Sequence, residues 1–293
     1  ASAVLDLFRL ELEQLGVEVQ CGIEIERIAP EKAGGFVLEG RSRAEDDGRQ
    51  RRVRADRVIL ACGGMAAPST GSDGSGYGLA RQLGHRVTPV YPALVQLRCR
   101  EGFYKELAGI RTEARVSLYI DGREEARDQG EVQMTAYRIS GIPVFQVSRY
   151  GAEALAQGKQ VEGVLDLAPS MSRKTLTQYF TAFSPQRYAG LLNKKLLSVL
   201  RKRYGDSPQA LAEGVKAFRT EIVGTNPFEN AQVTAGGVDT RQIDPATMMS
   251  RLHEGLYFAG EMVDVDGICG GYNLQWAWSS GSVAGRHAAG QGG

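Results

Sequence analysis

The fold is decided by residues 255–287, GLYFAGEMVDVDGICGGYNLQWAWSSGSVAGRH. The apolar triplet Leu256–Phe258 predicts a short strand that runs into a loop carrying two aspartates, Asp264 and Asp266. The pair Gly270-Gly271 follows, and the small and apolar residues after it predict a helix from about Tyr272 to Ala288. A strand, an acidic loop, a double glycine and a helix N-terminus together predict a site for a large anionic or dipolar ligand.

Two physical properties of this segment favour such a ligand. Glycine lets the backbone approach a ligand closely, and the unpaired N–H groups of a helix's first turn carry the positive end of the macrodipole. Phosphate commonly binds at such an end. The N1–C2=O2 edge of a flavin, which becomes negative on reduction, suits it equally well. The alternative is a glycine-rich loop that only precedes a core helix.

A second motif, RVILACGG at residues 57–64, makes the ligand site the stronger interpretation. Its apolar run predicts a strand buried on both faces in a parallel sheet. A polar, glycine-dense loop at residues 69–77 follows, and then a helix over 78–83 that ends at Gly84. Ligands of open α/β sheets bind beyond the carboxyl ends of the strands, so both glycine pairs are predicted to lie beside a cofactor.

In these motifs, the chain resembles a family of bacterial FAD-dependent flavoproteins that includes aminoacetone oxidase and a clostridial bile-acid-pathway reductase. The strings VILACGG, TGSDGSGYGLARQLGHRVTPVYPALVQL, AQVTAGGV and GLYFAGEMVDVDGICGGYNLQWAWSSG carry the resemblance, which extends over the whole chain. It implies a glutathione-reductase-type, Rossmann-like FAD/NAD(P)-binding domain, with an inserted β-barrel or sandwich domain and a helical insertion. It also implies FAD as the cofactor, with NAD(P)H as a candidate electron donor.

The resemblance places cofactor contacts at specific residues. Gly260 and Glu261 would contact the ribityl and pyrophosphate part, Asp264 would bind hydroxyl groups, and the backbone near Ile25 would face the adenine. The main-chain N–H groups of Tyr272, Asn273 and Leu274 would meet the pyrimidine edge of the flavin. Alternatively, Glu261 and Asp264 only cap loops. The full candidate set is Ile25, Cys62, Gly63, Gly64, Gly260, Glu261, Asp264, Gly270, Gly271, Tyr272, Asn273 and Leu274. No residue is assigned as a catalytic acid or base.

One expected motif is missing from the sequence. Flavoproteins of this type begin with a strand, a G-x-G-x-x-G turn and a helix, whereas this chain opens with an amphipathic helical pattern around Val4, Leu5 and Phe8. We therefore expect a fragment that lacks the first βαβ unit and binds FAD weakly or not at all by itself. Its truncated sheet would expose Val17, Val19 and residues 58–60, and self-association through that edge is expected.

The periodicities divide the chain into three parts. Residues 1–86 and 250–293 are expected to form the FAD-binding part, with a strand at 16–20 and an antiparallel meander of three short strands. Residues 87–169 and 223–249 form the β-rich substrate domain, and residues 170–222 form a three-helix insertion. The strands expected in the β-rich domain are 94–99, 114–120, 132–135, 144–147 and 161–166.

Composition excludes several classes of function. Thirty-five basic residues against thirty-four acidic ones give a net charge of +1, which offers no support for a nucleic-acid or membrane partner. No apolar run is long enough to span a membrane, and the four cysteines and three histidines show neither disulfide nor metal-ligand spacing. We expect a cytoplasmic protein with a small-molecule substrate and no metal.

Three hypotheses of function remain open. The first is a flavin-dependent oxidoreductase that acts on an amine, ketone or enone. The second is a folded, non-catalytic fragment that no longer retains FAD. The third is a dehydrogenase that uses nicotinamide alone, which the lack of a complete phosphate fingerprint disfavours.

Overall fold

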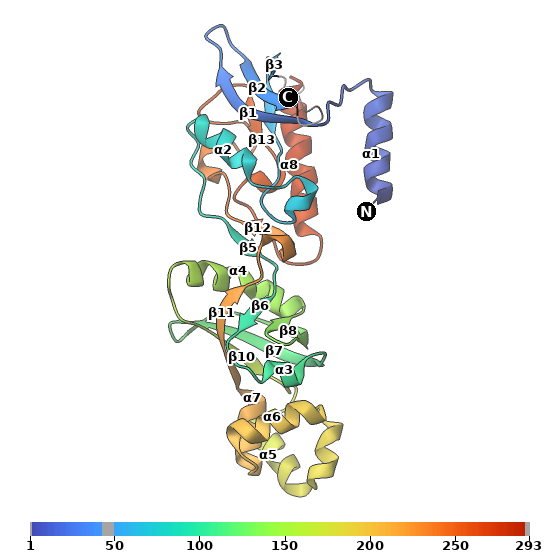
Figure 1. The fold of residues 1–293 in the computed structure, drawn as a ribbon, viewed down its shortest axis with the longest axis vertical. Helices are drawn as coiled ribbons and strands as arrows, with labels where there is room; N and C mark the ends of the chain where they lie inside the picture. The colour runs from blue at the N-terminus through green and yellow to red at the C-terminus, as the bar shows by residue number, and fades with distance from the viewer. Residues whose placement is uncertain (1, 43–49, 291–293) are drawn as a thin grey trace.

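The computed structural model describes residues 2–42 and 50–290. Figure 1 shows three parts along the longest axis of the molecule. A dinucleotide-fold part lies at one end, a β-barrel lies in the middle, and a group of helices lies at the far end of the barrel. Among the described residues, no helix is both long and apolar enough to cross a membrane.

The dinucleotide-fold part is built on two parallel strands. Strand β4 (Val58–Leu60) pairs with β13 (Leu256–Phe258), so segments almost two hundred residues apart in sequence lie side by side. Helices α2 (Ser75–Gln82) and α8 (Tyr272–Ala288) pack against this pair through one apolar core that includes Leu79. The predicted strands and the predicted C-terminal helix are confirmed, while α2 begins three residues earlier than expected.

The antiparallel meander is also confirmed. Strands β1 (Ile23–Pro30), β2 (Phe36–Ser42) and β3 (Gln50–Ala55) form a three-stranded sheet in that order. Its buried residues Ile28 and Phe36 belong to the same core as β4 and β13.

The middle part is a closed barrel and not a sandwich, the other architecture expected for it. Its six strands follow the order β10-β11-β6-β9-β8-β7. A short pair formed by β5 and β12 connects the barrel with the dinucleotide-fold part. The bounds are β5 Tyr91–Ala93, β6 Leu97–Cys99, β7 Arg111–Ile120, β8 Arg123–Met134, β9 Arg138–Ser140, β10 Val161–Asp166, β11 Phe218–Thr225 and β12 Val233–Ala235.

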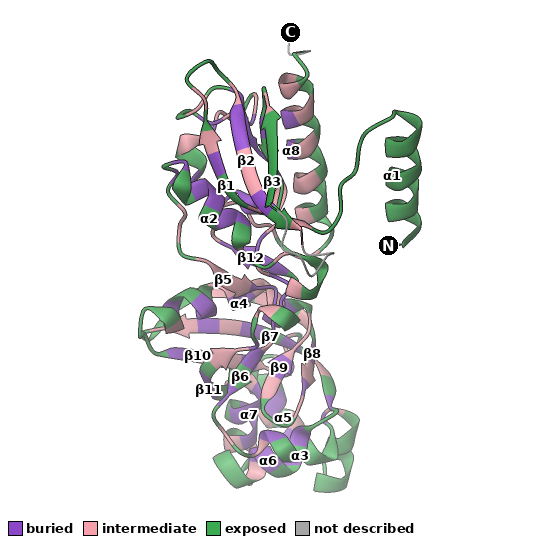
Figure 2. Ribbon diagram, turned by 45° about the horizontal axis from the view of Figure 1, so that its top comes forward, coloured by how far each residue is buried: buried purple, intermediate pink, exposed green. Residues whose placement is uncertain are grey.

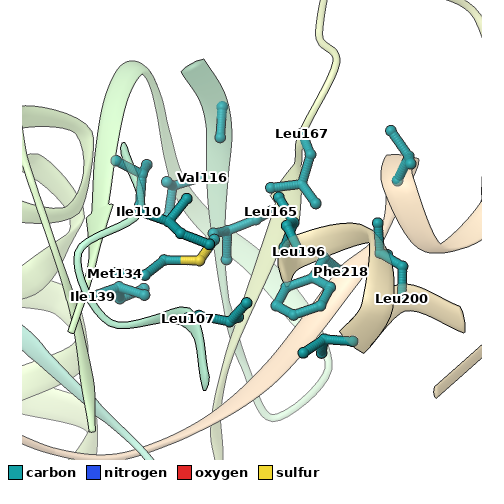
Figure 3. Packing of buried hydrophobic residues seen from close by; sticks show 14 of the residues in the cluster. Leu107, Ile110, Val116, Met134, Ile139, Leu165, Leu167, Leu196, Leu200 and Phe218 are labelled. Carbon is teal, nitrogen blue, oxygen red and sulfur yellow. The ribbon is translucent and has the colours of Figure 1, made fainter. Parts of the chain in front are cut away.

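The helical insertion contains the three predicted helices, α5 (Arg173–Ala182), α6 (Lys194–Tyr204) and α7 (Pro208–Lys216). Figure 3 shows Leu196 and Leu200 of α6 packing in one cluster with barrel residues such as Phe218 and Leu165. The insertion therefore shares its hydrophobic core with the barrel. The remaining short helices are α3 (Tyr104–Leu107) and the 3-10 turns Pro68–Thr70, Pro185–Gly190, Phe228–Asn230, Thr240–Gln242 and Gly260–Met262.

Two strand predictions were wrong. Residues 144–147 lie within helix α4 (Ile142–Ala156), because Pro143 suits a helix start and the apolar residues Val144, Val147 and Ala154 recur on one buried face. Residues 16–20 form no strand, since the described chain places no neighbouring strand beside them to complete the hydrogen bonds. The predicted domain boundary at residue 222 falls inside β11.

The predicted open edge of the sheet is exposed only in part. Val17, Val19 and Ile59 are exposed, whereas Val58 and Leu60 are buried at 7% and 4%, contrary to expectation. Helix α1 (Ser2–Gln14) has the predicted helical conformation but no buried residue, and Figure 2 shows it standing apart from the remainder of the molecule.

Candidate functional site

The carboxyl ends of the two parallel strands meet at one edge of the sheet. Leu60 pairs with Phe258, so the segments that follow, Cys62-Gly63-Gly64 and Gly260-Glu261, leave the sheet together. A Cβ atom placed on Gly64 would lie 2.6 Å from Glu261 Oε1. The structure thus brings both predicted glycine motifs to the same edge, and only a glycine fits where they touch.

The N-terminus of α8 opens onto a pocket of about 260 Å³. Gly271 precedes the helix with φ 92°, a left-handed conformation that favours glycine, and no side chain caps the first turn. A Cβ atom on Gly271 would meet no protein atom within 4 Å. Five predicted residues line this pocket: Glu261, Gly270, Gly271, Asn273 and Leu274. The first-turn N–H groups therefore begin at an open space that a ligand can enter.

Helix α4 of the barrel part fixes the loop that precedes α8. Arg149 forms an ion pair with Asp266 at 2.7 Å, and the Asp266 side chain is only 7% exposed. The Gln146 side-chain oxygen accepts a hydrogen bond from the Cys269 backbone N–H at 3.0 Å. Both contacts come from α4, which belongs to the barrel part. The position of this pocket wall therefore depends on how the barrel packs against the dinucleotide-fold part.

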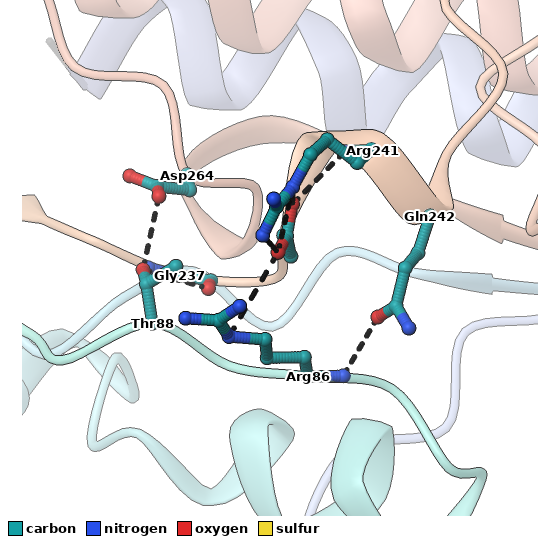
Figure 4. A network of polar contacts seen from close by, with 7 residues as sticks. Arg86, Thr88, Gly237, Arg241, Gln242 and Asp264 are labelled. Atoms are coloured by element: carbon teal, nitrogen blue, oxygen red, sulfur yellow. Dashed lines mark hydrogen bonds and ion pairs between the residues drawn. The ribbon is translucent and has the colours of Figure 1, made fainter.

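Glu261 and Asp264 both bind protein groups. One Glu261 oxygen accepts a hydrogen bond from the Thr234 N–H at 2.7 Å, and the Thr234 hydroxyl accepts one from the Met65 N–H, also at 2.7 Å. Burial raises the pKa of Glu261, and the hydrogen bonds from Thr234 oppose that shift. Asp264 accepts a hydrogen bond from the Thr88 hydroxyl at 3.0 Å, as Figure 4 shows. Both carboxylates thus fix loops, and only that of Glu261 also lines the pocket.

A second polar cluster supports the segment beneath Asp264 (Figure 4). Asp239 is 5% exposed and accepts hydrogen bonds from the Arg241 guanidinium, which holds the pKa of this carboxyl at about 2. The Thr88 hydroxyl also accepts a hydrogen bond from the Gly237 N–H at 3.0 Å. These contacts connect the residue 86–88 segment to the segment from 237 to 242 and stabilise the floor of the site.

The residue predicted at the adenine side, Ile25, lies in a different pocket. It lines a hollow of about 330 Å³ together with Cys62, Asp73 and Ser75. Burial raises the pKa of the Cys62 thiol, so this thiol is protonated at neutral pH. Of the twelve predicted residues, seven line these two hollows and Gly63, Gly64 and Gly260 lie at the sheet edge beside them, whereas Asp264 and Tyr272 line neither hollow.

Four further residues at the site were not predicted. Gln146 belongs to the segment 144–147 predicted as a strand, Arg149 follows that segment, and Thr234 lies within the AQVTAGGV string. Tyr77 ends the glycine-dense loop motif; it is 2% exposed, and its hydroxyl has no hydrogen-bond partner among the described residues. Burial and the nearby charges of Glu261 and Asp264 raise the pKa of this phenol. Tyr77 lines neither hollow, so its hydroxyl is an unsatisfied donor within the protein interior.

The residues present fit a flavin. The open, uncapped helix start suits the polar edge of the isoalloxazine, and Leu94 and Val233 give the facing wall an apolar surface. Leu94 adopts φ 49°, an uncommon conformation for a non-glycine residue, and such strained positions cluster at functional sites. Within the described ranges, no group of three or more His, Cys, Asp or Glu residues could bind a metal ion.

Comparison with known proteins shows one family and several relatives, three of which are described here. The family described as the HI0933-like protein Rossmann domain matches residues 1–287. The 3-dehydro-bile acid delta(4,6)-reductase of Clostridium scindens is 43% identical over 309 aligned residues, covering 99% of this chain and 73% of that protein. Two proteins named ribosomal RNA dihydrouridine synthase are also similar. The Escherichia coli protein is 29% identical and the Haemophilus influenzae protein 30%, with 96% of this chain covered in both alignments and 70% and 71% of the relatives.

Proposed function

Because the chain belongs to the HI0933-like Rossmann-domain family, we propose that it is an FAD-dependent oxidoreductase that saturates a carbon–carbon double bond conjugated to a carbonyl group. The observation that carries the proposal is the uncapped start of α8 beside the pocket at Gly270-Gly271. There, the N–H groups of Tyr272, Asn273 and Leu274 would bind the pyrimidine edge of the flavin. A helix N-terminus stabilises negative charge by about 0.3–2 kcal/mol, and this favours the reduced flavin.

The substrate class follows from the chemistry that the relatives' names share. A delta(4,6)-reductase and a dihydrouridine synthase, taken at their names, both add hydrogen across a ring double bond. In a 3-dehydro-bile acid and in uridine alike, that double bond is conjugated to a carbonyl. An enone is therefore favoured over the amine and the simple ketone, and the apolar wall formed by Leu94 and Val233 suits a ring substrate.

The cofactor and the protein residues have separate roles in this proposal. When bound, FAD supplies the hydride, with NAD(P)H as the proposed donor that reduces it. The chain's own residues position the ring: Gly271 leaves room for it, and Glu261 and Asp266 fix the loops around it through Thr234 and Arg149. Burial raises the pKa values of the Cys62 and Cys269 thiols, so neither cysteine is a reactive thiolate at neutral pH.

The test loads the protein with FAD, reduces the flavin anaerobically and mixes it with three probes. These are a 3-oxo steroid with a conjugated double bond, its saturated ketone, and a primary amine. The proposal expects the enone alone to reoxidise the flavin, with stoichiometric formation of the saturated product. Reoxidation by the saturated ketone alone would refute the substrate class, and protein that acquires no flavin would refute the cofactor.

A further inference from the structure

The charges of this chain are strongly segregated, although its net charge is only +1. Residues 170–217, which include the helical insertion, hold nine lysines and arginines but only two acids, a surplus of seven positive charges. The remaining residues hold 26 basic and 32 acidic residues, a deficit of six. Charge asymmetry of this size between parts of a chain indicates a polyanionic partner, which the whole-chain sum conceals.

Four of these cations are available to a partner. Lys174, Arg187, Lys194 and Lys195 are exposed, and none forms an ion pair with another described residue. The other insertion cations are mostly neutralised, as in the pairs Arg173–Glu213 and Lys202–Glu106, each at 2.9 Å. The uncompensated charge is thus concentrated at the start of α6 and the turn before it.

Helix stability does not explain the lysines at the start of α6. Lys194 and Lys195 occupy its first turn, where positive charge opposes the helix macrodipole, so they carry an energetic cost. Lys194 also lines a hollow of about 410 Å³ between α6 and the turn Pro185–Gly190, together with Gln186, Ser198 and Arg201. Cations combined with amide and hydroxyl groups suit a phosphate diester.

An aromatic ring lies beside this positive surface. Phe183 is 39% exposed, and the Arg187 guanidinium lies 5.6 Å from the centre of its ring. Exposed aromatic rings interleaved with arginine are the groups on which unpaired bases stack. Phe183 is the only large apolar side chain exposed in the described insertion, which gives a lipid bilayer nothing further to bury.

The position of the insertion separates its positive surface from the pocket. The whole barrel lies between the insertion and the pocket at Gly270-Gly271, so a small substrate cannot contact both (Figure 1). The core that the insertion shares with the barrel fixes it in place (Figure 3). We propose that residues 170–217 form a docking surface for single-stranded nucleic acid, in which Arg187, Lys194 and Lys195 bind backbone phosphates and Phe183 stacks on a base. This proposal goes beyond the flavin chemistry and does not depend on it.

Fluorescence anisotropy with a labelled single-stranded oligonucleotide, prepared both as RNA and as DNA, tests the surface. The three cations named in the proposal predict that log K falls with log[salt] with a slope of about −2. The triple variant Arg187→Gln/Lys194→Gln/Lys195→Gln should weaken binding at least about tenfold and make the slope shallower by about 2. Phe183→Ala should weaken binding about fivefold or more while leaving the slope unchanged.

The matched control removes the same charges elsewhere. The triple variant Lys32→Gln/Arg123→Gln/Lys159→Gln changes one arginine and two lysines, all exposed, and should leave affinity within about threefold. Because two unfavourable first-turn lysines are removed, the insertion variant should melt no lower than the wild type. The proposal is overturned if the wild type does not bind at low salt, if the control loses as much affinity, or if an acidic peptide or anionic vesicles bind equally well. Preference for RNA or for DNA identifies the natural source.

Discussion

Replacing Gly271 by valine should remove the flavin while leaving the protein folded. Gly271 has φ 92°, and a left-handed conformation costs an L-residue about 1–2 kcal/mol. An added Cβ atom meets no protein atom within 4 Å, so no steric cost is added to that figure. For a protein of this size, such a loss lowers the melting temperature by about 2–8 °C. The branched side chain would nevertheless project into the space proposed for the isoalloxazine ring.

The assay compares FAD affinity, measured by titration up to saturating FAD, with the melting temperature measured by circular dichroism. Gly281→Val is the matched control, because Gly281 lies in the same helix and a Cβ atom there also meets nothing. The control should keep its FAD affinity and change in stability by less than about 0.5 kcal/mol. If Gly271→Val retains full FAD affinity with an unchanged spectrum, the glycine pair is only the start of a helix.

Three further predictions follow from individual contacts. Arg149→Met leaves the Asp266 carboxylate, which is only 7% exposed, without its cation. The variant should bind flavin more weakly and be less stable by about 1–2 kcal/mol. A double-mutant cycle with Asp266→Asn, measured by calorimetry, should show coupling between the two sites. Tyr77→Phe removes an unsatisfied buried hydroxyl, so urea unfolding should show unchanged or raised stability; a clear loss of stability would mean that the hydroxyl has a partner within the protein. Burial and the neighbouring His253 lower the pKa of His85 from 6.5 to about 4, so its stabilising contribution is complete above about pH 6.5 and is lost as the pH falls towards 4. The free energy of unfolding should therefore drop by about 2 kcal/mol between about pH 7.5 and pH 5, and His85→Gln should abolish that part of the dependence.

The sequence was sufficient for elements whose signal is local. Strands β4 and β13 are short apolar runs followed by glycines, and α8 begins at a double glycine, so both could be located without contacts. The three insertion helices were found in the same way, from periodicity and from the Pro and Gly residues between them.

The misassigned elements depend on partners distant in sequence. Val144 and Val147 suit a strand by composition, yet Pro143 and the surface of the barrel make the segment a helix. Strand β8 runs from Arg123 to Met134 because it pairs with β7 along its length, although its own sequence is largely charged.

In the candidate site, too, local features could be predicted from the sequence and long-range contacts could not. The glycine positions could be predicted because their need is conformational and local, and Gly271 indeed has a positive φ. The contacts of Arg149 and Gln146 with the loop before α8 could not, because they join parts that are more than a hundred residues apart. The side chains of Glu261 and Asp264 bind Thr234 and Thr88, partners that no spacing rule identifies.

The central claim is that the first turn of α8 binds the flavin, and backbone amide NMR tests it most directly. In isotopically labelled protein at saturating FAD, the amide signals of Asn273 and Leu274 should shift strongly, and their hydrogen exchange should slow. The signals of the insertion, such as that of Ser198, should remain unchanged. Flavin binding without any change at residues 272–274, or no binding at all, would contradict the account.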